Sequence, residues 1–241
     1  MDDLIHTAIG IQARSTSVRL PRKVFELIDG TPMLTHVINS VKKTVYYLNG
    51  YENKKRTMVS WALLIPVGDD IRLHFSGPDT KILEGPEYDV LTRYWMLGEA
   101  TNADFICRIT SDCPMIPPYL IQKHIKLAVM NSYDYVSNVD ETVRTTLDGF
   151  DCEVMSRRML LWAHENAKDK EEREHVTLAI RRHPPVWAKV GHVVGHVDLS
   201  GMKISVDTFE DLERVRVQYD SIKKKILEIE RVHGKHHSHR F

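Results

Sequence analysis

The chain has 241 residues, of which 42% are hydrophobic and 27% charged, values typical of one soluble globular protein. Lysine plus arginine and aspartate plus glutamate number 33 each, so no overall positive field favours nucleic acid, and any affinity for anions must be local. The apolar run VSWALLIPV is too short to span a bilayer, and the first residues, MDDLIH, are acidic where a secretory signal is basic. Three cysteines without zinc spacing are typical of a reduced protein. We therefore expect a cytoplasmic protein that binds neither nucleic acid nor a membrane.

Hydrophobic periodicity predicts strands that alternate with helices along most of the chain. In chain order we expect a strand at 5–12, a helix at 31–43, a strand at 59–67, a helix at 87–101, a strand at 104–110, a helix at 118–131, a short strand at 134–138, an extended segment at 148–156, helices at 156–167 and 172–183, edge strands within 186–197, a strand at 203–206 and a long helix at 208–232.

Alternating strands and helices indicate an α/β fold with a mostly parallel sheet flanked by helices. Residues 139–198 depart from the alternation, so we interpret them as an excursion from a single domain, 1–232. The His-rich end, 233–241, is predicted to be a disordered tail.

Polar segments follow three of the predicted strands at their carboxyl ends, where α/β sheets bind ligands. The first is ARSTSVRLPRK, residues 13–23, a loop with four cations and several hydroxyl groups. Asp112 follows the strand at 104–110, and Asp207 follows the strand at 203–206, with Thr208 and Asp211 placed to cap the next helix. These segments are expected to meet in one crevice.

Cations in the first loop can hold a phosphate chain, but two carboxylates facing that chain repel it unless a divalent cation lies between them. Mg²⁺ is commonly held by one or two carboxylates together with substrate phosphates. The arrangement therefore predicts a metal-bound nucleoside triphosphate. Each segment also has a simpler interpretation, since basic loops are often solvated surface and aspartates often form turns.

The sequence also resembles a known family, the cytidylyltransferases that make CMP-activated sugars, which include the CMP-Kdo and CMP-sialic acid synthetases. It most resembles the SpsF-like branch of spore coat polysaccharide biosynthesis. The resemblance covers residues 9 to about 217 in seven ordered blocks: IQARSTSVRLPRKVF, LEGPEYDVLTRYW, ICRITSDCPMIPP, DYVSN, DGFDCEVMS, EREHVTLAIR and ISVDTFEDLERV. It implies a nucleotide-diphospho-sugar transferase fold, related to GT-A and Rossmann folds, with CTP as the donor and Mg²⁺ as the metal.

The resemblance also implies roles for individual residues. Those expected to bind the nucleotide are Ala13, Arg14, Ser17, Arg19, Lys23, Asp89 and Thr110. Those that match the metal-binding aspartates are Asp112 and Asp207, which form the catalytic group with Lys23 and Arg19. Those that would face the acceptor are Glu153, Arg173, Glu174 and His175, although a helix-packing role for His175 is equally compatible with its position.

The implied reaction is an in-line displacement in which an acceptor oxygen attacks the α-phosphorus of CTP and pyrophosphate leaves. The expected acceptor is an acidic sugar, such as a ulosonic or nonulosonic acid, or a phosphonate. The alternative is a glycosyltransferase-like or nucleotide-binding protein of the same fold with weakened cytidylyl transfer. In this family the excursion also makes the dimer contact, so a homodimer is expected.

Two features depart from the family pattern. Thr16 and Arg22 stand where the family loop, A-R-x-G-S-x-R-L-P-G-K, has glycines. Either the loop takes an ordinary conformation in which these side chains compensate, or catalysis is weakened or the donor changed. Retained triphosphate binding is favoured by the presence of Arg14, Ser17, Arg19 and Lys23. Residues 44–58 form a polar stretch that we interpret as a loop insertion, either solvated or docking a partner. The last helix carries a narrow apolar seam whose second half is a hypothetical contact with a partner subunit.

Overall fold

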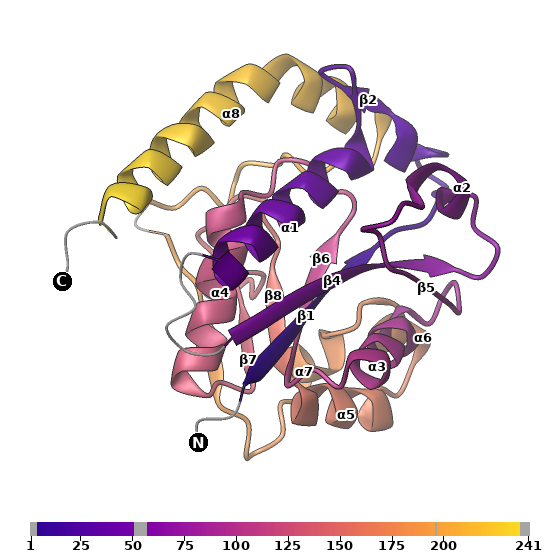
Figure 1. Ribbon diagram of the computed structural model, residues 1–241, viewed down its shortest axis with the longest axis vertical. Helices are drawn as coiled ribbons and strands as arrows, with labels where there is room; N and C mark the ends of the chain where they lie inside the picture. Colours follow the sequence, from indigo (N-terminus) through magenta and orange to yellow (C-terminus); the bar gives the residue numbers. More distant parts are fainter. Residues whose placement is uncertain (1–3, 51–56, 196, 237–241) are drawn as a thin grey trace.

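The computed structural model describes residues 4–50, 57–195 and 197–236, with side chains up to residue 228. Within these residues the centre of the molecule is a seven-stranded sheet with the order β5-β4-β1-β6-β8-β7-β9 (Figure 1). The strands span Ile82–Gly85 (β5), Thr57–Pro66 (β4), Ile5–Gln12 (β1), Phe105–Thr110 (β6), Glu153–Ser156 (β8), Tyr135–Ser137 (β7) and Val190–His192 (β9).

The sheet is parallel except at β8, which runs antiparallel to both of its neighbours, β6 and β7. β1 pairs with β4 and β6 in parallel, so Gln12 lies level with Leu64 on one side and Thr110 on the other. This confirms the predicted α/β fold with a mostly parallel, mixed sheet. The carboxyl ends of the central strands therefore share one edge.

Helices cover both faces of the sheet because successive strand residues point to opposite sides. Ile9 and Ile11 of β1 pack with α1 (Met33–Gly50) and α4 (Pro118–Asn131) in one buried cluster. Ala8 belongs to the opposite cluster, formed with α3 (Val90–Thr101), α5 (Arg157–Asn166) and the segment up to α7 (Leu178–Arg182). The two layers hold the sheet rigidly.

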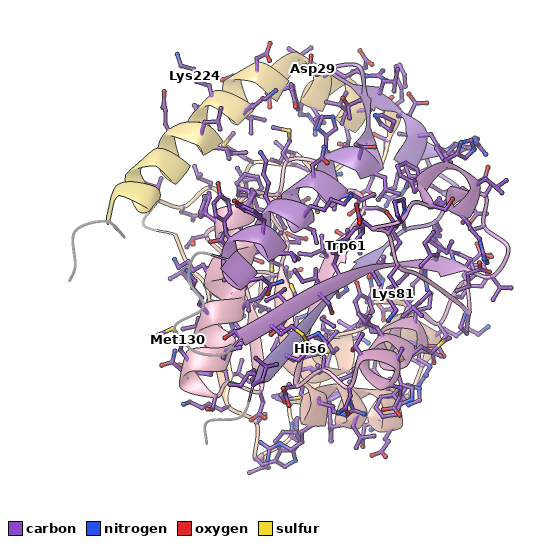
Figure 2. All side chains as sticks on the ribbon, viewed as in Figure 1. His6, Asp29, Trp61, Lys81, Met130 and Lys224 are labelled. Carbon is purple, nitrogen blue, oxygen red and sulfur yellow. The ribbon has the colours of Figure 1, made fainter. Side chains whose placement is uncertain are left out.

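A third apolar cluster lies beyond the sheet, where α8 (Phe209–His236) packs on the start of α1 and on the short hairpin β2–β3 (Leu27–Ile28 and Thr31–Pro32). Leu212, Val215 and Tyr219 are buried there, whereas Leu227 is exposed. The later turns of α8 extend away from the sheet in Figure 1, and Lys224 projects outward from the helix in Figure 2. His6, labelled in Figure 2, lies at the amino end of β1, at the edge of the sheet opposite to the carboxyl ends of the central strands.

Several predicted elements differ from those observed. α1 continues to Gly50 and β4 begins at Thr57, so the interpretation of 44–58 as a loop insertion is wrong except for 51–56, which lie outside the described residues. Thr44 and Leu48 are buried on this extended helix. The helix predicted at 172–183 is divided into α6 (Lys170–Glu174) and α7.

The segment 203–206 is not a strand but makes a single parallel bridge, between Asp148 and Lys203. The helix α2 (Ile71–Phe75), the edge strand β5 and a single helical turn at Lys23–Phe25 were not predicted. α8 continues past the predicted boundary at residue 232 as far as His236, and 237–241 lie outside the described residues.

Candidate functional site

The carboxyl edge of the sheet brings the three predicted segments together. The N–H group of Val206 donates to the carbonyl oxygen of Asp112 (2.9 Å), which joins the segment before α8 to the loop after β6. Lys23, from the loop after β1, donates through Nζ to the carbonyl oxygen of Val206 (2.7 Å). Three regions far apart in sequence thus meet at one point.

Lys23 lies between the two predicted metal-binding carboxylates. Its Nζ is 3.2 Å from Oδ1 of Asp207 and 3.5 Å from Oδ2 of Asp112, and its side chain is only 12% exposed. Burial opposes ionisation of Asp112, but Lys23 and a hydrogen bond from Thr110 outweigh it, so the pKa of Asp112 lies below its ordinary value. The Asp112 carboxylate is therefore an anion at neutral pH.

Asp207 also faces two further cations and the start of a helix. Arg19 approaches Oδ1 at 3.0 Å and Lys203 approaches Oδ2 at 3.4 Å. Asp211 accepts hydrogen bonds from the backbone N–H groups of Asp207 and Thr208, both at 3.1 Å. The hydroxyl of Thr208 in turn accepts from the N–H of Asp211 (3.3 Å), which confirms the predicted cap of α8. The cap fixes the backbone that carries Asp207.

The donor set fits a hard divalent cation. Asp112 and Asp207 offer carboxylate oxygens, and within the described ranges no cluster of three or more histidine, cysteine, aspartate or glutamate side chains competes with them as a metal site. Mg²⁺ is characteristically bound by one or two carboxylates, with water and phosphate oxygens completing its shell. A Zn²⁺ site would require nitrogen or sulfur ligands in addition.

The loop after β1 is held by backbone hydrogen bonds on both sides. Ala13 is buried and its N–H donates to the carbonyl oxygen of Leu64 (3.1 Å). The N–H of Ser15 donates to Oδ2 of Asp69 (2.9 Å), and the carbonyl oxygen of Ser15 accepts from the N–H of Arg22 (3.0 Å). The half-buried Ser17 lies within the segment that this last bond closes. The loop is therefore shaped before any ligand binds.

The two residues that replace family glycines behave differently. Thr16 is not among the described residues with positive φ, and its hydroxyl donates to Glu87 (2.5 Å), which agrees with an ordinary conformation. Arg22 has φ 58°, the left-handed region that glycine adopts at little cost. Its guanidinium pairs with Asp70 and lies 4.4 Å above the centroid of Phe25. These contacts offset part of the cost of the left-handed backbone at Arg22.

Predicted nucleotide and acceptor residues contact one another around α6. Arg14 pairs with Glu174 (3.3 Å), and its guanidinium lies 6.0 Å from the ring of Tyr88. Arg173 donates from Nε to Asp89 (2.7 Å), whose carboxylate also caps α3 through the N–H of Thr92 (2.9 Å). α6 is thus fixed against the start of α3 and the loop after β1.

His175 is exposed at the end of α6, whereas Glu153 is almost fully buried in β8. Glu153 accepts hydrogen bonds from Tyr135, from Thr177 (2.5 Å) and from Arg108 (2.5 Å). Burial disfavours its charge, but Arg108 and these hydrogen bonds hold the pKa of Glu153 below its ordinary value. Of the four residues predicted to face the acceptor, Glu153 is the one that does not reach the surface.

Sequence reasoning missed two arginines that shape the site. Arg93 is buried among the apolar residues of α3 and donates to the carbonyl oxygens of Leu64 (2.7 Å) and Ala13 (3.3 Å). Arg144 donates to the carbonyl oxygens of Thr146 (3.0 Å) and Leu147 (3.1 Å). Arg93 could have been found from the sequence, because it lies on the apolar face of the helix predicted at 87–101, where a charged side chain needs buried partners.

Asp151 is a further acidic group that was not predicted. It accepts a hydrogen bond from Arg144 (2.6 Å) and lies within electrostatic range of Asp148 and Asp112. Burial, opposed by Arg144 and reinforced by the two neighbouring aspartates, raises the pKa of Asp151 to about 6. The acidic side of the site therefore extends beyond the predicted pair.

A family comparison decides the class of protein. The model of the family described as "Cytidylyltransferase" matches residues 8–47 and 82–236, which include the loop after β1 and both aspartates. The chain is a cytidylyltransferase. Its expected place among the CMP-sugar synthetases, in the SpsF-like branch, agrees with the relatives and structures to which the chain is similar.

Two curated relatives cover most of the cytidylyltransferase chain. An uncharacterized protein of Methanocaldococcus jannaschii is 28% identical over 225 residues, covering 91% of this chain and 86% of its own length. The spore coat polysaccharide biosynthesis protein SpsF of Bacillus subtilis is 27% identical over 212 residues, covering 87% and 84%.

Solved structures of lower identity share the fold of this cytidylyltransferase. A cytidylyltransferase from Leptospira borgpetersenii has a TM-score of 0.77 at 21% identity and covers 96% of each chain. A CMP:2-keto-3-deoxy-manno-octonic acid synthetase complexed with CTP gives 0.65 at 14%, covering 89% and 98%. The manganese complex of Rv0371c from Mycobacterium tuberculosis gives 0.56 at 13%, covering 88% and 98%.

Helices long and apolar enough to cross a bilayer are absent from the described part of the cytidylyltransferase chain.

Proposed function

We propose that this cytidylyltransferase moves CMP from CTP to an acidic sugar, of the ulosonic or nonulosonic acid class, or to a phosphonate, with Mg²⁺ as the metal, in the synthesis of a surface polysaccharide or glycan. The observation that carries the proposal is the convergence of Lys23, Asp112 and Asp207 at the carboxyl edge of the sheet. The likeness to SpsF supports the polysaccharide context.

Transfer requires little covalent work from the protein, which must position the partners and neutralise charge. An acceptor oxygen forms a bond to the α-phosphorus, the bond to the β-phosphate oxygen breaks, and pyrophosphate leaves. Arg14 and Ser17 would bind along the nucleotide, and the backbone of Ala13 and the hydroxyl of Thr110 would lie near its base and ribose. Lys23 and Arg19 offset the charge that develops on the departing pyrophosphate.

Asp112 and Asp207 would hold Mg²⁺, whose positive charge makes the α-phosphorus more electrophilic. The lowered pKa of Asp112 supports this role, because a carboxylate must be ionised to bind a metal. A phosphonate acceptor attacks through an oxygen that is already anionic. A sugar hydroxyl loses its proton as the new bond forms, and the proton passes to solvent.

The acceptor is expected on the side of α6, where Glu174 pairs with Arg14 and the exposed His175 follows Glu174. Arg173 would contribute from the same helix, although its bonds to Asp89 and Thr92 tie it to α3. The excursion 139–198 would also form the contact of a homodimer, since it carries exposed apolar residues beside the edge strand β9: Val186, Trp187, Val194 and Val197.

Pyrophosphate release tests this function. The chain would be incubated with Mg²⁺, each of the four nucleoside triphosphates, and Kdo, N-acetylneuraminate or 2-aminoethylphosphonate as candidate acceptors. Release is expected with CTP alone among the triphosphates, and chelation of Mg²⁺ should abolish it. Stabilisation by UDP-sugars without pyrophosphate release would instead indicate glycosyl transfer.

Removing either carboxylate tests the metal assignment. Asp112→Asn and Asp207→Asn should each lower kcat by about 100-fold or more, since each removes a charge from the metal shell. The matched control is Asp220→Asn, an exposed carboxylate on α8, which should leave turnover unchanged. Full activity of either site variant at wild-type thermal stability would refute the assignment.

A further inference from the structure

A strained turn separates α6 from α7. Val176 has φ 56° although it is β-branched and fully buried. The N–H of Thr177 donates to the carbonyl oxygen of His175 at 2.5 Å, which closes a three-residue turn around Val176. A γ-turn with positive φ is rare and strained even for permissive residues. Strain of this kind persists only where the surroundings impose it.

Two sets of contacts impose the turn. The side chain of Val176 packs in the buried cluster of α3, α5 and α7. The hydroxyl of Thr177 donates to Oε1 of Glu153 at 2.5 Å, and Glu153 is fixed in β8 by Tyr135 and by Arg108, whose Nη1 lies 2.5 Å from Oε2. The turn is thus anchored to the sheet by a charged group that the solvent does not reach.

The hydrogen-bond network around Glu153 also reaches β1. Arg108 donates from Nε to the side-chain oxygen of Gln12 (3.1 Å), and Gln12 is the last residue of β1. Glu153 therefore has a hydrogen-bonded connection to both sides of the site. One side is the end of β1, and the other is the turn at Val176.

The residues placed by the turn lie directly before it. Glu174 pairs with Arg14 at 3.3 Å, and His175 is exposed beside it. A relaxed helix from 170 to 182 would continue α6 straight into α7, so α6 could not keep its place against α3 while α7 keeps its packing on α5. The strained turn therefore lets both helices pack and keeps Glu174 of α6 against Arg14 of the loop after β1.

We propose that the turn at Val176 is a positioning device of the transfer site, in which Thr177 and Glu153 hold the backbone so that Glu174 lies beside Arg14, with the exposed His175 next to Glu174 in the chain, where acceptor and nucleotide meet. This deepens the proposed function and rests on it. Glu153 is on this account a positioning residue and not a group that touches the acceptor.

The matched pair Thr177→Val and Thr177→Ser tests the proposal. Valine keeps the shape of threonine and loses the hydroxyl, whereas serine keeps the hydroxyl. The full-length protein would be labelled with ¹³C-histidine, the ring signal of His175 assigned with His175→Gln, and CTP titrated by calorimetry and by NMR in parallel. Wild type and Thr177→Ser should share one His175 signal, and that signal should shift on saturation with CTP.

In Thr177→Val the His175 signal should be displaced before CTP is added, and its CTP-induced shift should be lost at saturation. A merely structural role of Thr177 would lower the urea midpoint but leave the response to saturating CTP unchanged. A His175 signal in Thr177→Val that coincides with wild type and follows CTP in the same way overturns the proposal. Thr177→Ala, which places no methyl group against the carboxylate, carries the same test if the valine variant does not fold.

Failure of the proposed function gives a different result. If wild type shows no heat and no spectral change with CTP, the nucleotide assignment fails. The displacement of the His175 signal between Thr177→Val and Thr177→Ser then still decides whether the turn positions that side chain.

Discussion

Arg22 occupies a backbone conformation that favours glycine, at the point where the loop after β1 turns into the helical turn Lys23–Phe25. Its side chain repays part of this cost through Asp70 and the ring of Phe25. The result is a loop that keeps its shape without glycine at this position, and Lys23, the next residue, enters the site at a fixed angle.

Substitution of Arg22 separates the backbone cost from the side-chain contacts. Arg22→Ala and Arg22→Gly both remove the contacts with Asp70 and Phe25, but only glycine relieves the left-handed backbone. Arg22→Gly should therefore be more stable than Arg22→Ala by about 1 kcal/mol in urea denaturation. Equal stability of the two variants would show that the backbone is not strained at this position.

Asp151 predicts a pH dependence of stability. Burial raises its pKa from 3.8 to about 6, so between these values the folded chain binds more protons than the unfolded chain at this group. The contribution of Asp151 to the free energy of unfolding therefore falls by up to about 3 kcal/mol as pH rises from about 4 to 6. The groups that face it are Arg144, Asp148, Asp112 and Glu153.

Urea denaturation at several pH values checks this, without divalent cations. The free energy of unfolding of wild type, minus that of Asp151→Asn, should decrease as pH rises from 4 to 6 and stay constant above about 6. Arg144 loses a charged partner in the variant, so the change with pH is the decisive quantity and not the absolute difference. A constant difference across this range would contradict the raised pKa.

The roles of single residues were predictable to different degrees. Lys23, Asp112 and Asp207 could be expected to meet because each follows a predicted strand, and parallel strands end at one edge. The buried position of Glu153 could not be inferred, because it depends on Arg108, Tyr135 and Thr177, which come from three other elements. The strain at Val176 was hidden for a related reason: its sequence reads as an uninterrupted helix.

At the scale of elements, Gly149 joins the excursion to the segment that carries Asp207. It has φ 109°, and a Cβ atom there would lie 2.5 Å from the backbone nitrogen of Ser205 and 2.7 Å from the carbonyl carbon of Ile204. The carbonyl oxygen of Asp148 accepts from the N–H groups of Ile204 (2.7 Å) and Ser205 (3.1 Å). This close approach takes the place of the strand that was predicted at 203–206.

Gly149→Ala should therefore be much more costly than substitution of a glycine in open space. We expect a loss of about 3 kcal/mol in urea denaturation, because both backbone strain and a clash with main-chain atoms must be relieved. The control is Gly30→Ala, where φ is 70° but no atom lies within 4 Å of the added carbon, with an expected loss of about 1 kcal/mol. Equal losses in the two variants would contradict the role of the contact.

Elements buried on both sides were predicted better than elements that depend on contacts distant in sequence. β1 was predicted at its observed bounds because its apolar run has no competing pattern. The extension of α1 to Gly50 was missed because 44–50 includes exposed tyrosines, although Thr44 and Leu48 face the core. The edge strand β5 was missed because it is short and only partly buried.

At the scale of the whole molecule, the excursion places exposed apolar residues beside β9, the last strand of the sheet. Edge strands of this kind are usually protected or paired. Trp187 is 41% exposed and stacks on Arg158, whose guanidinium lies 4.0 Å from the ring centroid. The surface formed by residues 186–195 and 197–198 of the excursion is therefore the expected homodimer contact.

Analytical ultracentrifugation at micromolar concentration should give a dimer for wild type and a monomer for Trp187→Glu, since the substitution removes apolar contact area and the contact would have to take a carboxylate out of water. Leu73→Glu alters an exposed apolar residue of α2 and serves as the control that should remain dimeric. If Leu227→Glu were monomeric and Trp187→Glu dimeric, the dimer contact would lie on α8 and not on the excursion. A monomeric wild type would exclude both surfaces.

The ammonium group of Lys23 ties residue 23 to the backbone of residue 206 and to the carboxylate of residue 207. During synthesis on the ribosome, the first acidic partner, Asp112, emerges long before the second. The proposed site can close only after the start of α8 has left the exit tunnel, because the cap at Asp211 fixes the backbone of Asp207. A nascent chain that stalls before this point carries a nearly complete sheet and no working site.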